Sequence, residues 1–125
     1  MKRLAILLGG LLLAAANATG FAIGGAPFQQ AEILDARAMP EIDGSTSILL
    51  TFDPKAAPRL EKLSAANIGK PLAVTLDGRT IASPTVDEPI TTGTLTLTGG
   101  FTLPEAEALA KRISGKEPVP EEFED

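Results

Sequence analysis

Apolar and polar residues alternate along three stretches of this 125-residue chain. The alternating apolar residues are Ile48, Leu50 and Phe52 in residues 45–52, Leu72, Val74 and Leu76 in residues 72–76, and Leu95 and Leu97 in residues 92–98. A period of two is that of a β-strand with one buried face. The pattern therefore predicts three strands, and a weaker fourth over residues 32–39, where alanines dilute the alternation.

Two predicted turns connect these strands. Asp77 and Gly78 follow residues 72–76 directly, and Asp-Gly suits a two-residue type I′ turn, which needs positive φ at both positions. We expect residues 79–83 to return antiparallel and complete a hairpin. Pro40 and the pair Asp43-Gly44 mark a second turn, before residues 45–52.

A first helix is predicted over residues 57–67. Pro58 is tolerated there because it falls in the first turn, where its missing N–H costs no hydrogen bond. Gly69 can adopt the left-handed conformation that closes a helix. We therefore expect Gly69 to end this helix.

A second helix is predicted after a tight turn at Gly99 and Gly100. Thr102 and Glu105 have the spacing of a capping box, in which each side chain accepts a hydrogen bond from the other residue's backbone N–H. Gly115 is expected to end the helix. Together the elements predict an α+β fold, with an antiparallel sheet of four or five strands and two helices packed on one face.

A series of short motifs surrounds the predicted hairpin: residues 67–78 (NIGKPLAVTLDG), 81–84 (IASP), 90–93 (ITTG) and 98–103 (TGGFTL), followed by the helix that contains Glu105 and Leu109. This series resembles a known family, the periplasmic head subdomain of SecD, a membrane subunit of the bacterial protein-export machinery. The resemblance covers residues 31–115 and implies the shape of the head, and at most its proposed role of contacting emerging polypeptide. Two departures are Gly100, where the family commonly has asparagine, and Lys116-Glu117-Pro118, where it usually runs Ala-Leu-Pro.

The N-terminal residues have the features of a secretory signal peptide. Lys2 and Arg3 precede a Leu- and Ala-rich run, and residues 16–18 (Ala-Asn-Ala) form a small-residue cleavage site. We expect cleavage after Ala18, with a second candidate site after Ala22. The alternative is an uncleaved inner-membrane anchor over residues 4–23, which approaches the ~20 residues that span a bilayer.

Four segments follow from these features: a signal peptide (1–18), a flexible linker (19–30), the domain (31–115) and an acidic, disordered tail (116–125). The linker prediction rests on three glycines and a proline without periodicity. Phe28, within the linker, is expected to be exposed. The tail contains Pro118, Pro120 and five acidic residues, a composition typical of disorder.

Charge and composition exclude several functions. Removal of residues 1–18 leaves nine basic and sixteen acidic side chains, a net charge of −7. Such an acidic chain repels phosphate backbones and anionic lipid surfaces, so we expect no nucleic-acid partner. Cleavage of residues 1–18 is expected to leave no stable membrane span. The chain has no cysteine and no histidine, which excludes a lipid-modified cysteine, Ser-His and Cys-His catalysis, and thiolate or imidazole metal sites.

The candidate partner-binding residues lie on the threonine-rich predicted strand over residues 92–98 and in the loop before it. A threonine-rich face is usually solvated sheet surface, but it can also accept an extended peptide. The candidate partner-binding residues are Thr94, Thr96, Thr98, Pro84, Val86, Asp87 and Glu88.

The leading hypothesis is a secreted, stand-alone, non-catalytic binding module of the periplasm, without cofactor or metal, that assists protein export by contacting polypeptide or the translocase. One alternative is a cell-envelope structural or interaction protein that reuses the scaffold. A second is a small hydrolase acting through Asp77 or Asp87, because paired carboxylates can hydrolyse glycosides. The carboxylates lie in different predicted loops, which disfavours this last alternative.

Overall fold

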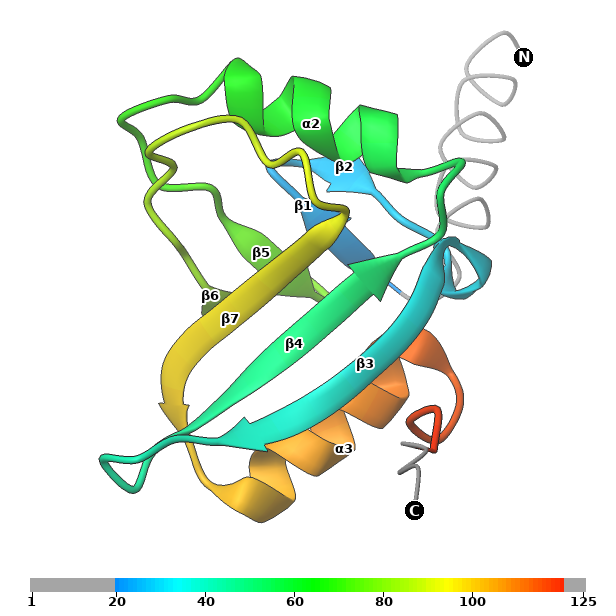
Figure 1. Cartoon of the computed structure of the whole chain (residues 1–125), viewed down its shortest axis with the longest axis vertical. Coiled ribbons are helices and arrows are strands. Elements are labelled where there is room, and N and C mark those ends of the chain that lie inside the picture. Colours follow the sequence, from blue (N-terminus) through cyan, green and yellow to red (C-terminus); the bar gives the residue numbers. More distant parts are fainter. Residues whose placement is uncertain (1–19, 121–125) are drawn as a thin grey trace, which may run out of the picture.

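The computed structural model describes residues 20–120 (Figure 1). The elements in chain order are β1 (Phe21–Ile23), β2 (Ala26–Pro27), η1 (Gln30–Glu32), β3 (Ile33–Pro40), β4 (Thr46–Phe52), α2 (Ala57–Ala65), β5 (Val74–Leu76), β6 (Arg79–Ala82), β7 (Thr94–Phe101) and α3 (Leu103–Ser114). The predicted signal peptide (1–18) and residues 121–125 of the predicted tail lie outside the described residues.

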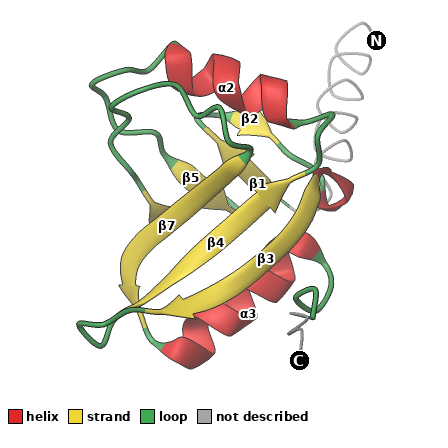
Figure 2. Cartoon of the chain, in the orientation of Figure 1, coloured by secondary structure: helices red, strands yellow, loops and turns green. Residues whose placement is uncertain are grey.

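The strands are divided between two antiparallel sheets, as Figure 2 shows. One has the order β2-β1-β5-β6 and the other the order β3-β4-β7. The predicted α+β class, with antiparallel strands and two helices, is confirmed. The sequence predicted a single sheet with both helices on one face, whereas α3 covers one face of the three-stranded sheet and α2 lies beside the β1–β2 hairpin (Figure 1).

The three-stranded sheet and α3 bury their apolar faces against each other. Ile48 and Leu50 of β4 are fully buried, as are Ala106 and Ile113 of α3. The helix begins with the expected capping box, in which Thr102 accepts from the Glu105 N–H and Glu105 accepts from the Thr102 N–H. Its last turn is followed by Gly115 at φ 77°, the left-handed conformation that glycine adopts without steric cost.

The hairpin of β5 and β6 has the predicted two-residue turn. Asp77 has φ 53° and Gly78 has φ 81°, and Leu76 pairs with Arg79 across the turn. Both central residues therefore have positive φ, as a type I′ turn requires.

Residues 20–30 belong to the domain, so the prediction of a flexible linker is wrong for this part of the chain. β1 pairs with β5, and Phe21, Ile23 and Phe28 are all fully buried. The predicted exposure of Phe28 is therefore also wrong. The ring of Phe28 packs edge-on against Phe52, with centroids 5.4 Å apart.

The first helix is shorter than predicted, because α2 ends at Ala65. The Asn67 side chain donates to the Leu63 carbonyl at 2.8 Å and so satisfies an acceptor of the last turn. Gly69, with φ 81°, lies in the following turn, where the Lys70 N–H donates to the Asn67 carbonyl. The prediction that Gly69 closes the helix is therefore wrong, although its positive φ is as expected.

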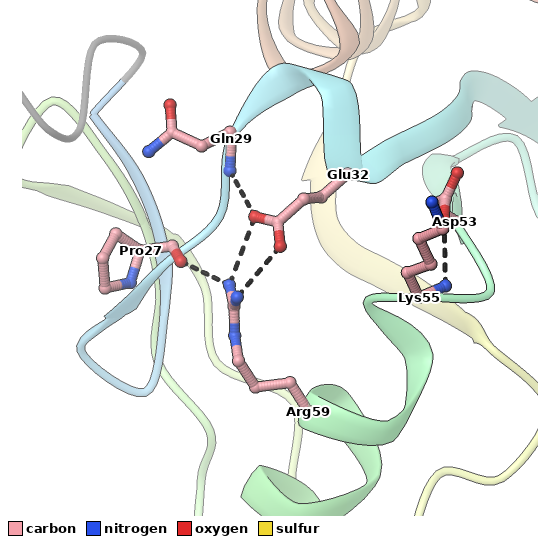
Figure 3. Close-up of polar contacts among 6 residues, drawn as sticks. All are labelled: Pro27, Gln29, Glu32, Asp53, Lys55 and Arg59. Carbon is pink, nitrogen blue, oxygen red and sulfur yellow. Dashed lines mark hydrogen bonds and ion pairs between the residues drawn. The ribbon is translucent and has the colours of Figure 1, made fainter.

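Arg59 joins α2 to the N-terminal segment (Figure 3). Its guanidinium donates to both carboxylate oxygens of Glu32 and to the carbonyl of Pro27, and it lies 3.9 Å from the centre of the Phe28 ring. The same figure shows Asp53 accepting the Lys55 N–H before α2 begins. These contacts fix the start of α2 over the N-terminal segment.

Residues 116–120 lie against β3, so the prediction of a disordered tail is wrong for them. We call these residues the C-terminal strap. The Lys116 ammonium donates to the Ile33 carbonyl at 2.7 Å, and the Val119 N–H donates to the Asp35 carboxylate at 2.6 Å. The strap thus contacts a strand that lies more than eighty positions earlier in the chain.

Candidate functional site

One face of the three-stranded sheet is left uncovered by the described helices and strands, on the side opposite α3 (Figure 1). The register places Arg37 opposite Leu49, and Leu49 opposite Thr96. Because side chains alternate between the two faces of a strand, these three side chains share the face that the buried residues leave free. We call this surface, formed by Arg37, Met39, Leu49, Thr51, Thr94 and Thr96, the open face.

The structure places the threonines of β7 on this side, whereas their neighbours Leu95 and Leu97 are buried. Thr96 is exposed, and Thr94 is half-buried with its hydroxyl 2.9 Å from that of Thr92. Thr98 is exposed as well, but it lies beyond a register shift between β4 and β7. Thr94 and Thr96 therefore belong to one paired surface, and Thr98 lies at its margin.

The loop over residues 84–92, which connects β6 to β7, is attached to the chain before β5. The Gly69 N–H donates to the Val86 carbonyl, and the Val86 N–H donates to the Lys70 carbonyl. Val86 is only 5% exposed, so the prediction that its side chain contacts a partner is wrong. It is a core anchor of the loop.

The remaining loop candidates are at the surface. Asp87 and Glu88 are exposed and Pro84 is half-buried. All three help to line a shallow groove of about 240 Å³ that reaches Leu95 of β7. The loop candidates and the start of β7 are thus neighbours in space.

The carboxylates suggested for a hydrolase are held apart. Asp77 forms an ion pair with Arg112 of α3, while Asp87 lies in the loop before β7. Among residues 20–120, no three acidic side chains are grouped as a metal site requires.

Sequence reasoning missed a polar cluster formed by Asp35, Arg37 and Val119. Asp35 is 8% exposed, and its carboxylate accepts from the Arg37 Nε at 2.8 Å and from the Val119 N–H at 2.6 Å. Arg37 also donates to the Val119 carbonyl. The available signal was the Asp-x-Arg spacing in the predicted strand 32–39, which places both side chains on one face.

The electrostatics of this cluster favour the ionised carboxylate. Burial alone would raise the pKa of Asp35, but the hydrogen bonds from Arg37 and from the Val119 backbone lower it. The charges of Arg37 and Lys116 lower it further, so the pKa of Asp35 lies below its ordinary value. The Asp35 carboxylate is therefore charged at neutral pH.

A comparison with protein-family models assigns most of the chain. The family described as the SecDF P1 head subdomain matches residues 25–116. The match runs from the β1–β2 turn to the first residue of the strap. Within residues 20–120, no helix has both the length and the apolar character needed to cross a membrane.

Individual relatives agree with the family match. The protein translocase subunit SecDF of Thermus thermophilus is 38% identical over 91 residues, and the SecD subunit of Acidaminococcus fermentans is 36% identical over 89 residues. These alignments cover 72% and 70% of this chain, but only 12% and 21% of the relatives. The chain thus spans a small part of the proteins that it matches.

The fold is also that of solved SecDF structures. A structure of SecDF, described as a membrane component that enhances protein export, superimposes with a TM-score of 0.66 at 34% identity, over 77% of this chain and 44% of that chain. A second, of SecDF in a super-membrane-facing form, gives 0.65 at 34% identity, over 77% of this chain and 13% of the other. By sequence and by fold, the chain belongs to the SecDF P1 head subdomain family.

Proposed function

We propose that this chain is a non-catalytic periplasmic module that assists protein export by contacting polypeptide through the open face and the loop over residues 84–92. Family membership supports the export role. The observation that carries the proposed mode of action is the open face itself, a three-stranded surface that no described helix or strand covers.

The chemistry of the open face suits contact with an extended chain. Threonine hydroxyls such as that of Thr96 both donate and accept hydrogen bonds, so they pair with any peptide group. Leu49, half-buried in the middle strand, adds an apolar contact. A surface of this kind demands no particular sequence, and its contacts are weak enough to release a passing polypeptide.

The loop adds charge beside the open face, because Glu88 lines a groove together with Thr94. Val86 and Ile90 anchor the loop, the latter through its N–H to the Ser64 hydroxyl at 2.8 Å. Asp87 and Glu88 extend into solvent between these anchors. Their negative charge would favour segments that carry lysine or arginine.

The position of β1 bears on the proposed leader cleavage. Phe21 and Ile23 are fully buried, so an N-terminal anchor would have to end before Phe21. Cleavage after Ala18 leaves β1 whole, whereas cleavage after Ala22 would remove Phe21 from the core. We therefore favour Ala18 as the cleavage site.

The proposal can be tested by photocrosslinking in cells that export a tagged reporter protein. A photoreactive residue at Thr96 is expected to form adducts with the reporter while it is being exported. The matched control is the same residue at Glu61, which is exposed on α2. A second control is a reporter without its signal peptide, which should form no adduct.

Equal yields of reporter adducts from the photoreactive residue at Thr96 and at Glu61 would contradict the proposal that the open face contacts polypeptide. The role in export would be overturned if the residue at Thr96 formed no adduct with the reporter and captured one folded envelope protein instead.

A further inference from the structure

The Asp35–Arg37 pair holds both backbone polar groups of one residue, Val119. The Asp35 carboxylate accepts the Val119 N–H, and the Arg37 guanidinium donates to the Val119 carbonyl. The two side chains also bind each other, with Arg37 Nε 2.8 Å from Asp35 Oδ2. A neighbouring β-strand would offer a peptide the same two partners, one acceptor and one donor.

Asp35 and Arg37 contact the backbone of Val119. Val119 remains 49% exposed, so about half of its surface makes no contact with the domain. Charge-assisted hydrogen bonds of this kind are stronger than those between neutral groups. The pair therefore has the chemistry to hold an extended peptide of almost any sequence.

The position of the pair connects it to the rest of the candidate site. Arg37 is opposite Leu49, which is opposite Thr96. Adjacent strands lie about 4.8 Å apart, so the pair is roughly 10 Å from Thr96 across the open face. On its other side, Arg37 borders a groove of about 860 Å³ between β3, α3 and the strap, with Met39 and Ala110 among its lining residues.

We propose that Asp35 and Arg37 form a binding site for the backbone of an extended polypeptide, and that the C-terminal strap occupies this site in cis until a polypeptide displaces it. The proposal rests on the proposed function and names its site: the bound polypeptide would enter at β3 and continue across the open face. Release of the strap frees one acceptor and one donor for the backbone N–H and C=O of a residue in the incoming polypeptide.

The strap is suited to such an exchange. Pro118 and Pro120 flank Val119 and have no N–H of their own, so Val119 offers the pair its peptide N–H without competing donors next to it. A tethered occupant competes at a high effective concentration. Loosening the strap should therefore strengthen binding of an external polypeptide.

The test measures binding of fluorescent, reduced and carboxamidomethylated ribonuclease A, which stays unfolded in buffer, to the full chain and to matched variants. Val119→Pro removes the N–H that Asp35 accepts and leaves the pair intact, whereas Val119→Ala keeps the N–H. We expect binding to tighten about tenfold in Val119→Pro, the factor that one charge-assisted hydrogen bond is worth, and to be unchanged in Val119→Ala.

Arg37→Gln replaces the charged guanidinium with a shorter, neutral amide and so removes the charge-assisted hydrogen bond. It is expected to weaken binding about tenfold, alone and combined with Val119→Pro. Lys62→Gln, on the exposed side of α2, makes the same charge change and should leave binding unaltered. Amide exchange at Val119 gives a readout in the unaltered chain: its N–H should exchange faster when the unfolded probe is bound.

The outcomes separate this inference from the proposed function. Binding that is equal in all variants, or that leaves Val119 exchange unchanged, overturns the Asp35–Arg37 site and leaves polypeptide contact standing. No binding to any variant, Val119→Pro included, overturns both.

Discussion

Arg59 of α2 and Glu32 of η1 form an ion pair across 27 positions of sequence, with Arg59 Nη1 2.9 Å from Glu32 Oε2. Arg59 also covers the ring of Phe28 and binds the Pro27 carbonyl (Figure 3). One side chain thus connects a helix to the buried N-terminal segment. The contacts are partly exposed, with the Arg59 side chain 43% accessible.

Arg59→Ala should lower the free energy of unfolding by about 1–2 kcal/mol, because it removes an exposed ion pair worth up to ~1 kcal/mol and a cation–π contact worth ~0.5–1 kcal/mol. Arg59→Lys keeps the charge and loses only the planar guanidinium that binds both carboxylate oxygens of Glu32, so its effect should be smaller. Urea unfolding measures both. Lys62 is an exposed lysine of the same helix, so Lys62→Ala is the control and should leave the free energy of unfolding unchanged. If the Arg59→Ala chain were as stable as this control, Arg59 would not stabilise the contact between α2 and the N-terminal segment.

Phe28→Ala should destabilise the domain far more, by about 3–5 kcal/mol, because it empties a fully buried aromatic site beside Phe52. Ile42→Ala, in the exposed turn between β3 and β4, should change stability by less than about 0.5 kcal/mol. Chemical denaturation of the two variants distinguishes a core segment from a linker. Equal stability of both variants would restore the linker interpretation of residues 20–30.

The sequence correctly predicted those helices, strands and turns that depend on residues close together in the chain. The alternation around Leu50, the Asp77-Gly78 turn and the Thr102–Glu105 capping box all describe contacts between near neighbours. Such local patterns indicate which side of a strand is buried, but they do not indicate which other strand pairs with it.

The missed features depend on contacts that are distant in sequence. β1 has three residues and β2 has two, too few to show a period, and Gly24 and Gly25 resemble a linker although they form the turn between these strands. Only pairing with β5, about fifty positions later, makes β1 a core strand. The same holds for the division into two sheets.

The candidate site shows the same limit. The polar side of β7 was predictable from its alternating threonines, such as Thr96. The burial of Val86 was not, because it results from the bridges to Ile68 and Lys70. The contact between Asp35 and Val119 joins residues 84 positions apart, so no local sequence pattern predicts it.

Acidification should release the strap. The pKa of Asp35 is lowered in the folded chain, so its contribution to stability is present above the ordinary value of about 3.9 and is lost as the pH falls through the lowered value. Arg37 and Lys116 remain charged in this range. The Val119 amide resonance in NMR spectra should therefore shift with a midpoint below pH 3.9.

Asp35→Asn should abolish this titration of the Val119 amide. Asp43→Asn is the matched control, because the pKa of Asp43 is also lowered, by hydrogen bonds from Ser45, but Asp43 lies in the turn between β3 and β4. A Val119 midpoint that survives in Asp35→Asn would show that another group controls the strap.

Gly115 and Gln30 are expected to be energetically coupled. Both Gly115 and Gly44 have positive φ, 77° and 92°, so alanine at either position costs ~1–2 kcal/mol of backbone strain. A Cβ at Gly115 would lie 2.6 Å from the Gln30 side chain, whereas one at Gly44 would meet nothing within 4 Å. Gln30 would have to move and give up its 3.0 Å hydrogen bond to the Arg112 carbonyl, at a further cost of ~0.5–1.5 kcal/mol.

Gly115→Ala should therefore destabilise the domain more than Gly44→Ala, by about 0.5–1.5 kcal/mol in urea unfolding. Combining Gly115→Ala with Gln30→Ala should cost less than the sum of the two single changes, because the second change removes the atoms that the first one displaces. Gln30→Ala combined with Gly44→Ala should be additive, since those residues share no contact. Additive costs at Gly115 and Gln30 would mean that the end of α3 shifts away from η1 instead of displacing the Gln30 side chain.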